Sequence, residues 1–199
     1  MQTQKKGFTL IELLIVIGIL AVLATVTVLV LNPAELFRQA RDSQRISDLG
    51  TIKSAIGLYI TTVTNPDIQY GSFTCGTNFS ASVASASTTF PTAGTILQAG
   101  IFTAAGAGWI PINFSVMPGG SPLSILPRDP RNVIGNGGDR IDGGFYYTYA
   151  CDSSIPSFVL KANMESTRYT TTGTDDVEST DGGPDNSRYE TGTYPNLSL

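Results

Sequence analysis

The chain has 199 residues, of which 14% are charged, and its formal net charge is −4. This balance argues against a nucleic-acid-binding protein, because such proteins present a strongly basic surface. The sequence contains no histidine, which removes the commonest general base and the commonest metal ligand. It also lacks a phosphate-binding loop, a nucleophile elbow and a dinucleotide fingerprint. We therefore expect a protein that is not an enzyme, with one domain in addition to any membrane anchor.

An apolar segment runs from Phe8 to Leu31 and contains a single ionisable residue, Glu12. Its 24 residues, at about 1.5 Å each, are enough to cross a bilayer as a helix. A carboxylate inside such a helix costs roughly 2.5–3.5 kcal/mol, so we expect Glu12 to have a partner. Cleavage after Gly7 would create one, because the new α-amine at Phe8 could meet Glu12 on a neighbouring copy.

The order of these features distinguishes two kinds of N-terminal signal. A secretory signal peptide is cut after its apolar region, whereas here the basic residues and Gly7 precede it. The stretch KKGFTLIELLIVIGILAVLA resembles the class III leader and N-terminal helix of type IV prepilins and type II secretion pseudopilins. The residues that match this pattern are Lys5, Lys6, Gly7, Phe8 and Glu12. The resemblance implies that residues 1–7 are a leader, that prepilin peptidase cuts after Gly7, and that the amine of Phe8 is methylated. The alternative is an ordinary signal anchor whose Glu12 lies at the membrane interface.

Residues 8–31 would form the transmembrane or filament-core half of a long helix, and residues 32–63 its amphipathic half. Apolar residues recur in the second half every three or four positions, which gives a stripe for packing onto a globular domain. The stripe comprises Ile46, Leu49, Ile52, Ile56, Tyr59, Ile60 and Val63. Pro33 predicts a kink or melted turn near Val30–Pro33, and Gly18 is a second weak point. The basic residues that interleave with acidic ones predict a solvated helix face. They are Arg38, Arg41 and Arg45.

The rest of the chain predicts loops and a small sheet. Residues 64–125 are rich in Ser, Thr, Ala and Gly, and the family resemblance makes them a variable loop region. Short pieces of structure are expected there at Ile96–Phe102 and Trp109–Val116. An antiparallel sheet is predicted within residues 126–165, with strands at Gly144–Ala150 and Ser157–Asn163, where aromatic and β-branched residues are concentrated. The helical stripe would cover one sheet face, giving an α+β fold class similar to that of type IV pilins.

The tail, residues 166–199, is acidic and poor in apolar residues, and we predict either a wrapped loop or partial disorder. Clustered carboxylates in a Gly-rich loop suit Ca²⁺, which takes six to eight oxygen ligands. The candidate ligands are Asp175, Asp176, Asp181 and Asp185. The resemblance adds that major pseudopilins bind calcium in a C-terminal acidic loop. The alternative is a solvated acidic tail without a metal.

The chain has two cysteines, Cys75 and Cys151. Lys5 and Lys6 precede the apolar segment, as expected for the cytoplasmic side of a membrane, which would place the following residues outside. Compartments outside the cytoplasm are oxidising, so we expect the two cysteines to form a disulfide. The alternative is two separate buried thiols.

These features predict the structural subunit of a type IV pilus-like filament, which is a helical polymer of identical subunits. Before assembly it would be a single-pass inner-membrane protein, and afterwards part of an extracellular or periplasmic filament. The resemblance implies three further partners: prepilin peptidase, an inner-membrane assembly platform and a cytoplasmic ATPase. Within this family the alternative is a major-type pseudopilin of a type II secretion system. In other classes, the alternatives are a monomeric membrane-anchored surface binding protein and an anchored enzyme with an unrecognised site.

Overall fold

The computed structural model forms two compact units, Met1–Arg38 and Gln39–Leu199. Within them, the structure describes residues 7–82, 95–99, 102–131, 133–135, 138–140, 145–152 and 156–193. Lys5 and Lys6 of the predicted leader therefore lie outside the described residues.

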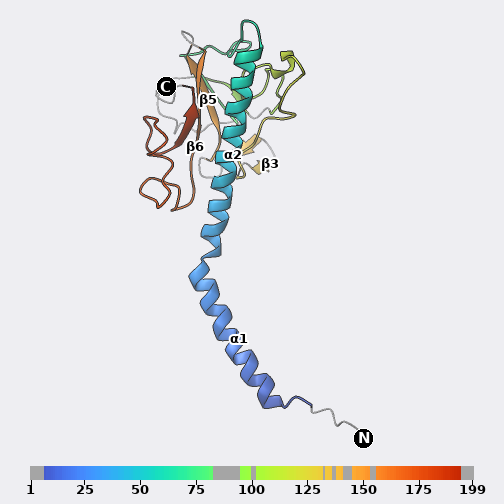
Figure 1. Cartoon of the computed structure of the whole chain (residues 1–199), viewed down its shortest axis with the longest axis vertical. Helices are drawn as coiled ribbons and strands as arrows, with labels where there is room; N and C mark the ends of the chain where they lie inside the picture. The colour runs from blue at the N-terminus through green and yellow to red at the C-terminus, as the bar shows by residue number, and fades with distance from the viewer. Residues whose placement is uncertain are drawn as a thin grey trace. The chain divides into compact units, whose positions relative to one another are not determined.

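Two helices follow one another in the first third of the chain (Figure 1). Helix α1 spans Leu10–Leu31 and helix α2 spans Pro33–Thr62. Between them, Asn32 adopts a left-handed conformation with φ 40°, which ends α1. Pro33 is well suited to start α2, because the first residue of a helix has no intrahelical partner for its N–H. The interruption thus lies inside the predicted interval, whereas α1 passes through Gly18 without a break.

The second unit contains a five-stranded sheet with the strand order β2-β1-β5-β6-β7. Strand β1 runs parallel to β2, and the other neighbours are antiparallel. The strands of this sheet are β1 (Asn78–Ala81), β2 (Thr95–Ala99), β5 (Thr148–Asp152), β6 (Ser157–Ala162) and β7 (Tyr189–Gly192). A separate antiparallel pair joins β3 (Val133–Gly135) to β4 (Gly138–Arg140), and one short 3₁₀ helix, η1, spans Phe114–Val116. The α+β fold class predicted from the sequence is confirmed.

The sheet draws on more of the chain than residues 126–165. Strands β1 and β2 come from the region predicted as a variable loop, and β7 comes from the acidic tail. The first predicted strand starts at Thr148 instead of Gly144, which lies outside the described residues. Strand β7 has the sequence YETG, which shows no apolar alternation. It becomes a strand because its backbone pairs with the edge of β6, a long-range contact that local patterns do not reveal.

Helix α2 packs on one face of this sheet, as predicted (Figure 1). The stripe residues Leu49, Ile52 and Ile56 are fully buried. The register pairs Tyr149 with Leu160 and Cys151 with Phe158, so alternate residues of β5 and β6 face the same core. The core residues from these two strands, together with the residue just before β5, are Tyr147, Tyr149, Cys151, Phe158, Leu160 and Ala162.

A loop segment completes the core. Trp109, Ile110, Ile112 and Phe114 are all 0% exposed, although their region was predicted to hold only short pieces of structure. The Trp109 indole N–H donates to the carbonyl of Pro127 at 3.1 Å, which satisfies its one polar group. The Phe114 ring meets Tyr59 of α2 edge-on at 5.8 Å between ring centroids. The loop therefore joins α2 to the rest of the core.

A buried cluster of charges fixes α2 to two distant loops, and it corrects the prediction of a solvated arginine face. The exposed fraction of the side chain falls from 49% at Arg38 to 31% at Arg41 and 0% at Arg45. Arg45 donates from Nε and Nη2 to the two carboxylate oxygens of Asp129, at 2.7 and 3.0 Å. It also donates to Asp42 at 2.7 Å and to Glu165 at 2.6 Å.

The carboxylates of this cluster are satisfied from several sides. Asp42 accepts the backbone N–H groups of Glu165 and Ser166. Glu165 also accepts two bonds from Arg41, at 2.9 and 2.7 Å, and one from Arg131 at 3.2 Å. A buried guanidinium is tolerated only with such complete pairing. The cluster therefore ties α2, the segment around Asp129 and the turn after β6 into one body.

We expect this cluster to make the free energy of unfolding depend on pH in the acidic range. Burial alone raises the pKa of Glu165, but hydrogen bonds from Arg41 and Arg45 outweigh it and lower the pKa from 4.5 to about 2. The pKa of Glu165 is lower in the folded protein than in the unfolded chain. The contribution of the ionised Glu165 to the free energy of unfolding is therefore fully present above about pH 4.5, and it is lost as the pH falls towards about 2. Urea unfolding at a series of pH values measures this loss. In Glu165→Gln the same pH range should show a weaker dependence, and an unchanged dependence would contradict the assignment.

Candidate functional site

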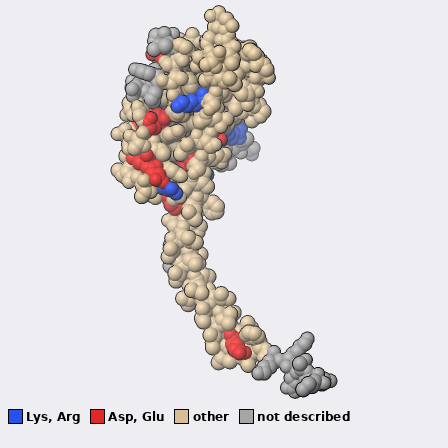
Figure 2. Space-filling model, in the orientation of Figure 1, with Lys and Arg blue, Asp and Glu red and all other residues tan. Residues whose placement is uncertain are grey.

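Helix α1 presents apolar side chains around its whole circumference. From Leu10 to Val28 it is long and apolar enough to cross a membrane, and none of that stretch is buried. Among the large apolar side chains of α1 whose burial the structure describes, the exposed fraction ranges from 45% at Val16 to 83% at Leu10. The face of α1 seen in Figure 2 carries charge only near its start, where the sequence places Glu12. A helix that is apolar all round requires lipid or other apolar helices around it.

The start of α1 is held by a reciprocal cap between Thr9 and Glu12. The backbone N–H and the hydroxyl of Thr9 both donate to Oε2 of Glu12, at 2.8 and 2.7 Å. The backbone N–H of Glu12 donates in return to the Thr9 hydroxyl at 3.3 Å. Within the described part of the chain, no donor reaches the second oxygen, Oε1. The carboxylate is therefore fixed at the helix end with one oxygen still able to accept a bond.

Sequence reasoning did not identify Thr9 as a partner of Glu12. A signal for it was present, because a threonine followed three residues later by a glutamate, just before an apolar run, is the pattern of a capping box. The predicted pairing of Glu12 with the amine of a neighbouring Phe8 needs a second copy, so it stays a prediction.

The bond between Gly7 and Phe8 lies where a peptidase can reach it. Residues 7–9 precede the helix, and both Gly7 and Phe8 are exposed, Phe8 at 82%. Among the described residues, and apart from Gly7 and its chain neighbours, no atom lies within 4 Å of the position that a side chain on Gly7 would occupy. Exposed chain without helical hydrogen bonds is the usual substrate conformation for proteolysis. The local structure thus suits cleavage at this bond.

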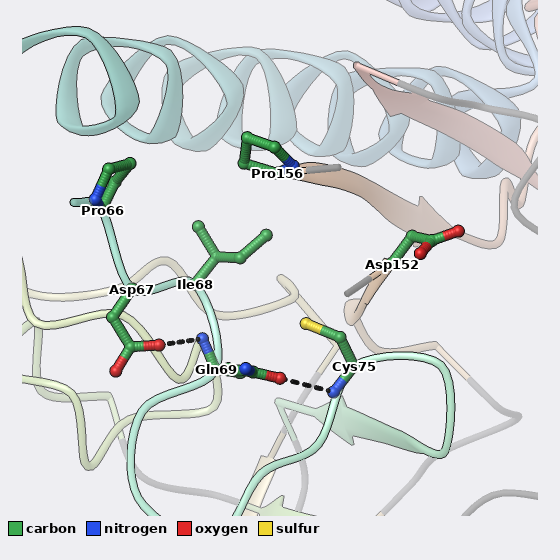
Figure 3. Close-up of a pocket in the computed structure, with 7 residues that line it drawn as sticks. All are labelled: Pro66, Asp67, Ile68, Gln69, Cys75, Asp152 and Pro156. Carbon is green, nitrogen blue, oxygen red and sulfur yellow. Dashed lines mark hydrogen bonds between the residues drawn. The ribbon is translucent and has the colours of Figure 1, made fainter. Parts of the chain in front are cut away.

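The predicted disulfide is present between Cys75 and Cys151, with a Cα–Cα distance of 4.8 Å. It attaches the loop before β1 to strand β5. Next to it is a cavity of about 230 Å³ (Figure 3). The lining residues are Pro66, Asp67, Ile68, Gln69, Cys75, Asp152 and Pro156.

Polar groups beside the cavity organise the cysteine-bearing loop. Asp67 accepts the backbone N–H of Gln69 at 3.0 Å, and the side-chain oxygen of Gln69 accepts the N–H of Cys75 at 3.2 Å (Figure 3). The backbone N–H of Gly76 donates to the carbonyl of Cys151 at 2.8 Å. These bonds hold Cys75 against β5, where the disulfide forms.

The acidic tail is a wrapped loop from Ser166 to Arg188, and strand β7 follows it. Its aspartates are engaged by nearby groups of the chain. Asp176 accepts the N–H groups of Thr172, Glu178 and Ser179, and the bonds from Ser179 lower its pKa. Asp181 accepts the backbone N–H of Gly183, and Asp185 accepts the backbone N–H of Ser187. Asp175 forms an ion pair with Arg168. These contacts build turns.

Calcium binding by Asp175, Asp176, Asp181 and Asp185 stays a prediction. In the described part of the chain, no three acidic, cysteine or histidine side chains are grouped so that they could share one metal ion. A bound Ca²⁺ would have to compete with the backbone N–H groups that bind Asp176, Asp181 and Asp185 and with the Arg168 guanidinium that binds Asp175.

Comparison with known protein families finds a match at the start of the chain. Residues 2–28 match the prokaryotic N-terminal methylation motif. No curated protein and no solved structure matches the chain. The matched residues contain the exposed Gly7–Phe8 bond, the Thr9–Glu12 cap and most of the apolar helix. The motif implies processing by prepilin peptidase and, in general, assembly into a filament. Residues 2–28 thus carry an N-terminal methylation motif of the kind that includes the class III leader of type IV pilins and pseudopilins.

Proposed function

We propose that this protein is the structural subunit of a type IV pilus-like filament. The proposal depends on one observation about α1. This helix is long enough to cross a membrane, its apolar side chains are exposed on all sides, and it has one carboxylate at its start. Such a helix can rest in lipid before assembly and in a bundle of identical helices afterwards. Its role is structural and not catalytic.

Glu12 would select the position of each subunit along the filament. Lipid and a helix bundle are about equally apolar, so the transfer between them gains little hydrophobic free energy, and packing and polar contacts decide the outcome. Thr9 occupies Oε2 of Glu12, so the methylated amine of a neighbouring Phe8 would approach Oε1. A subunit placed in another register would leave both charges unpaired away from water, at a high free-energy cost.

Processing and extraction need other proteins. The proposal includes insertion in the inner membrane with the N-terminus in the cytoplasm, and cleavage after Gly7 by prepilin peptidase. An assembly platform and a cytoplasmic ATPase would supply the work of extraction, because the transfer itself releases little free energy.

Two substitutions of Glu12 test the proposal in cells that contain a prepilin peptidase and an assembly system. The wild-type chain should lose seven residues and gain one methyl group, as read by intact mass, and should form filaments visible by electron microscopy. Glu12→Ala and Glu12→Gln should both be cleaved but should fail to assemble. Glutamine keeps a capping box and removes only the charge, so it separates helix capping from charge pairing.

Three results would count against this reading. A wild-type product that still begins at Met1 would contradict processing. Normal filaments from Glu12→Gln would show that charge pairing does not set the register. Short filaments confined to the periplasm, in place of long surface fibres, would favour the secretion pseudopilin.

A further inference from the structure

The tripeptide Asn-Phe-Ser occurs twice among the described residues, at 78–80 and at 113–115. An asparagine followed two residues later by serine or threonine, with no proline between, is the acceptor sequence for N-linked glycosylation of exported proteins. A third match, Asn196-Leu197-Ser198, lies outside the described residues. The two identical tripeptides allow the effect of the fold to be separated from that of the sequence.

The first copy is enclosed by the fold. Asn78 is 7% exposed, and its side-chain oxygen accepts the N–H of Thr74 at 2.8 Å. Ser80 is fully buried in β1 and donates its hydroxyl to the carbonyl of Trp109. A sugar on Asn78 would have no room in the folded protein, and the hydroxyl that a transferase must recognise is hidden.

The second copy is presented at the surface. Asn113 is partly exposed and Ser115 is exposed, while Phe114 between them is buried in the core and anchors the segment. The side-chain oxygen of Asn113 accepts both the N–H of Ser115, at 3.1 Å, and its hydroxyl. Within the described residues, no hydrogen bond engages the amide nitrogen, Nδ2. The recognition hydroxyl and the acceptor amide therefore lie together, with Nδ2 uncommitted.

We propose that Asn113 is a site of N-linked glycosylation, and that Asn78 is not. The donor class is a lipid-linked oligosaccharide whose anomeric carbon C1 is bonded to pyrophosphate. In the transfer, Nδ2 of Asn113 forms a bond to C1 and the bond from C1 to the phosphate oxygen breaks. The electron pair of that bond leaves with the lipid pyrophosphate, and one Nδ2 proton passes to a base of the transferase. The inference rests on the proposed membrane orientation, in which the N-terminus is cytoplasmic and the residues after helix α1 are exported.

The test uses the full chain, expressed in bacterial cells that hold a lipid-linked oligosaccharide and an oligosaccharyltransferase that accepts Asn-x-Ser. Peptide mapping by mass spectrometry should find the oligosaccharide on Asn113 and none on Asn78. Ser115→Ala should reduce occupancy of Asn113 to background, and Ser115→Thr should retain it. Both substitutions change an exposed side chain by little, so the fold should persist, as a retained Cys75–Cys151 disulfide would confirm.

The disulfide also separates the two proposals. A known acceptor protein in the same cells shows that the transferase is active. If the cysteines are oxidised and Asn113 carries no sugar, the glycosylation site is refuted while export stands. Occupancy that persists in Ser115→Ala would refute it as well, because recognition would not depend on the tripeptide. If the cysteines remain reduced and no sugar is found, export is refuted together with the site that depends on it.

Discussion

Replacing Arg45 with methionine should lower the free energy of unfolding by about 3–5 kcal/mol. Arg45 is fully buried and pairs with Asp42, Asp129 and Glu165. Methionine fills much of the same volume but leaves Asp129 buried without the guanidinium that binds both of its oxygens. An uncompensated buried charge costs more than the lost attraction itself. Urea unfolding of the full chain in detergent micelles measures the change through the fluorescence of Trp109, the one tryptophan of the chain, which is buried.

The same helix offers matched controls. Arg38→Met should change the free energy of unfolding by no more than about 0.5 kcal/mol, because Arg38 is half exposed and its pair with Glu35 is 3.6 Å long. In Arg45→Met, replacing Asp129 with leucine as well should restore much of the loss, since no unpaired carboxylate then remains at that position. Equal effects of Arg38→Met and Arg45→Met would contradict a role for the buried cluster.

Opening the Cys75–Cys151 disulfide should cost about 4 kcal/mol, since the chain-entropy model assigns roughly this value to a cross-link that closes a loop of such length. The two cysteines are 76 positions apart in sequence. The disulfide also holds the loop before β1 against β5. Its loss should therefore loosen the pairing of β1 with its neighbours in the sheet, β2 and β5. Urea unfolding of the full chain in micelles, with and without a reductant, gives the difference.

The doubly substituted chain, Cys75→Ala with Cys151→Ala, serves as the control for the reductant. It should unfold at the same lower urea concentration as the reduced wild type, and reductant should not change it further. If the oxidised and the reduced wild-type protein unfold at the same urea concentration, the disulfide does not contribute to the stability of the native state.

Amide exchange would show which region depends on the disulfide. Reduction should increase exchange most at Gly76 and Asn78, whose N–H groups donate to Cys151 and Thr74 in the cross-linked loop. It should increase exchange less in β6, which is paired on both sides.

Local sequence patterns accounted for the N-terminal third of the chain. The apolar run from Phe8, the break at Asn32 and Pro33 and the buried stripe on α2 all depend on residues close together in sequence, so they could be predicted from the amino acids alone. The methylation motif is also a local sequence pattern, and it supports the proposed function. The cysteine pair could be predicted because the chain contains only two cysteines.

Tertiary structure alone decided the rest. Arg45 looked like its neighbours Arg38 and Arg41, and only Asp129 and Glu165, 84 and 120 positions away, make it a buried residue. Strand β7 forms because its backbone pairs with an edge of β6, and Phe114 and Trp109 enter the core by packing against Tyr59 and Tyr147. Helix periodicity is a short-range property of the chain, whereas charge pairing, strand pairing and core filling depend on which distant residues the fold brings together.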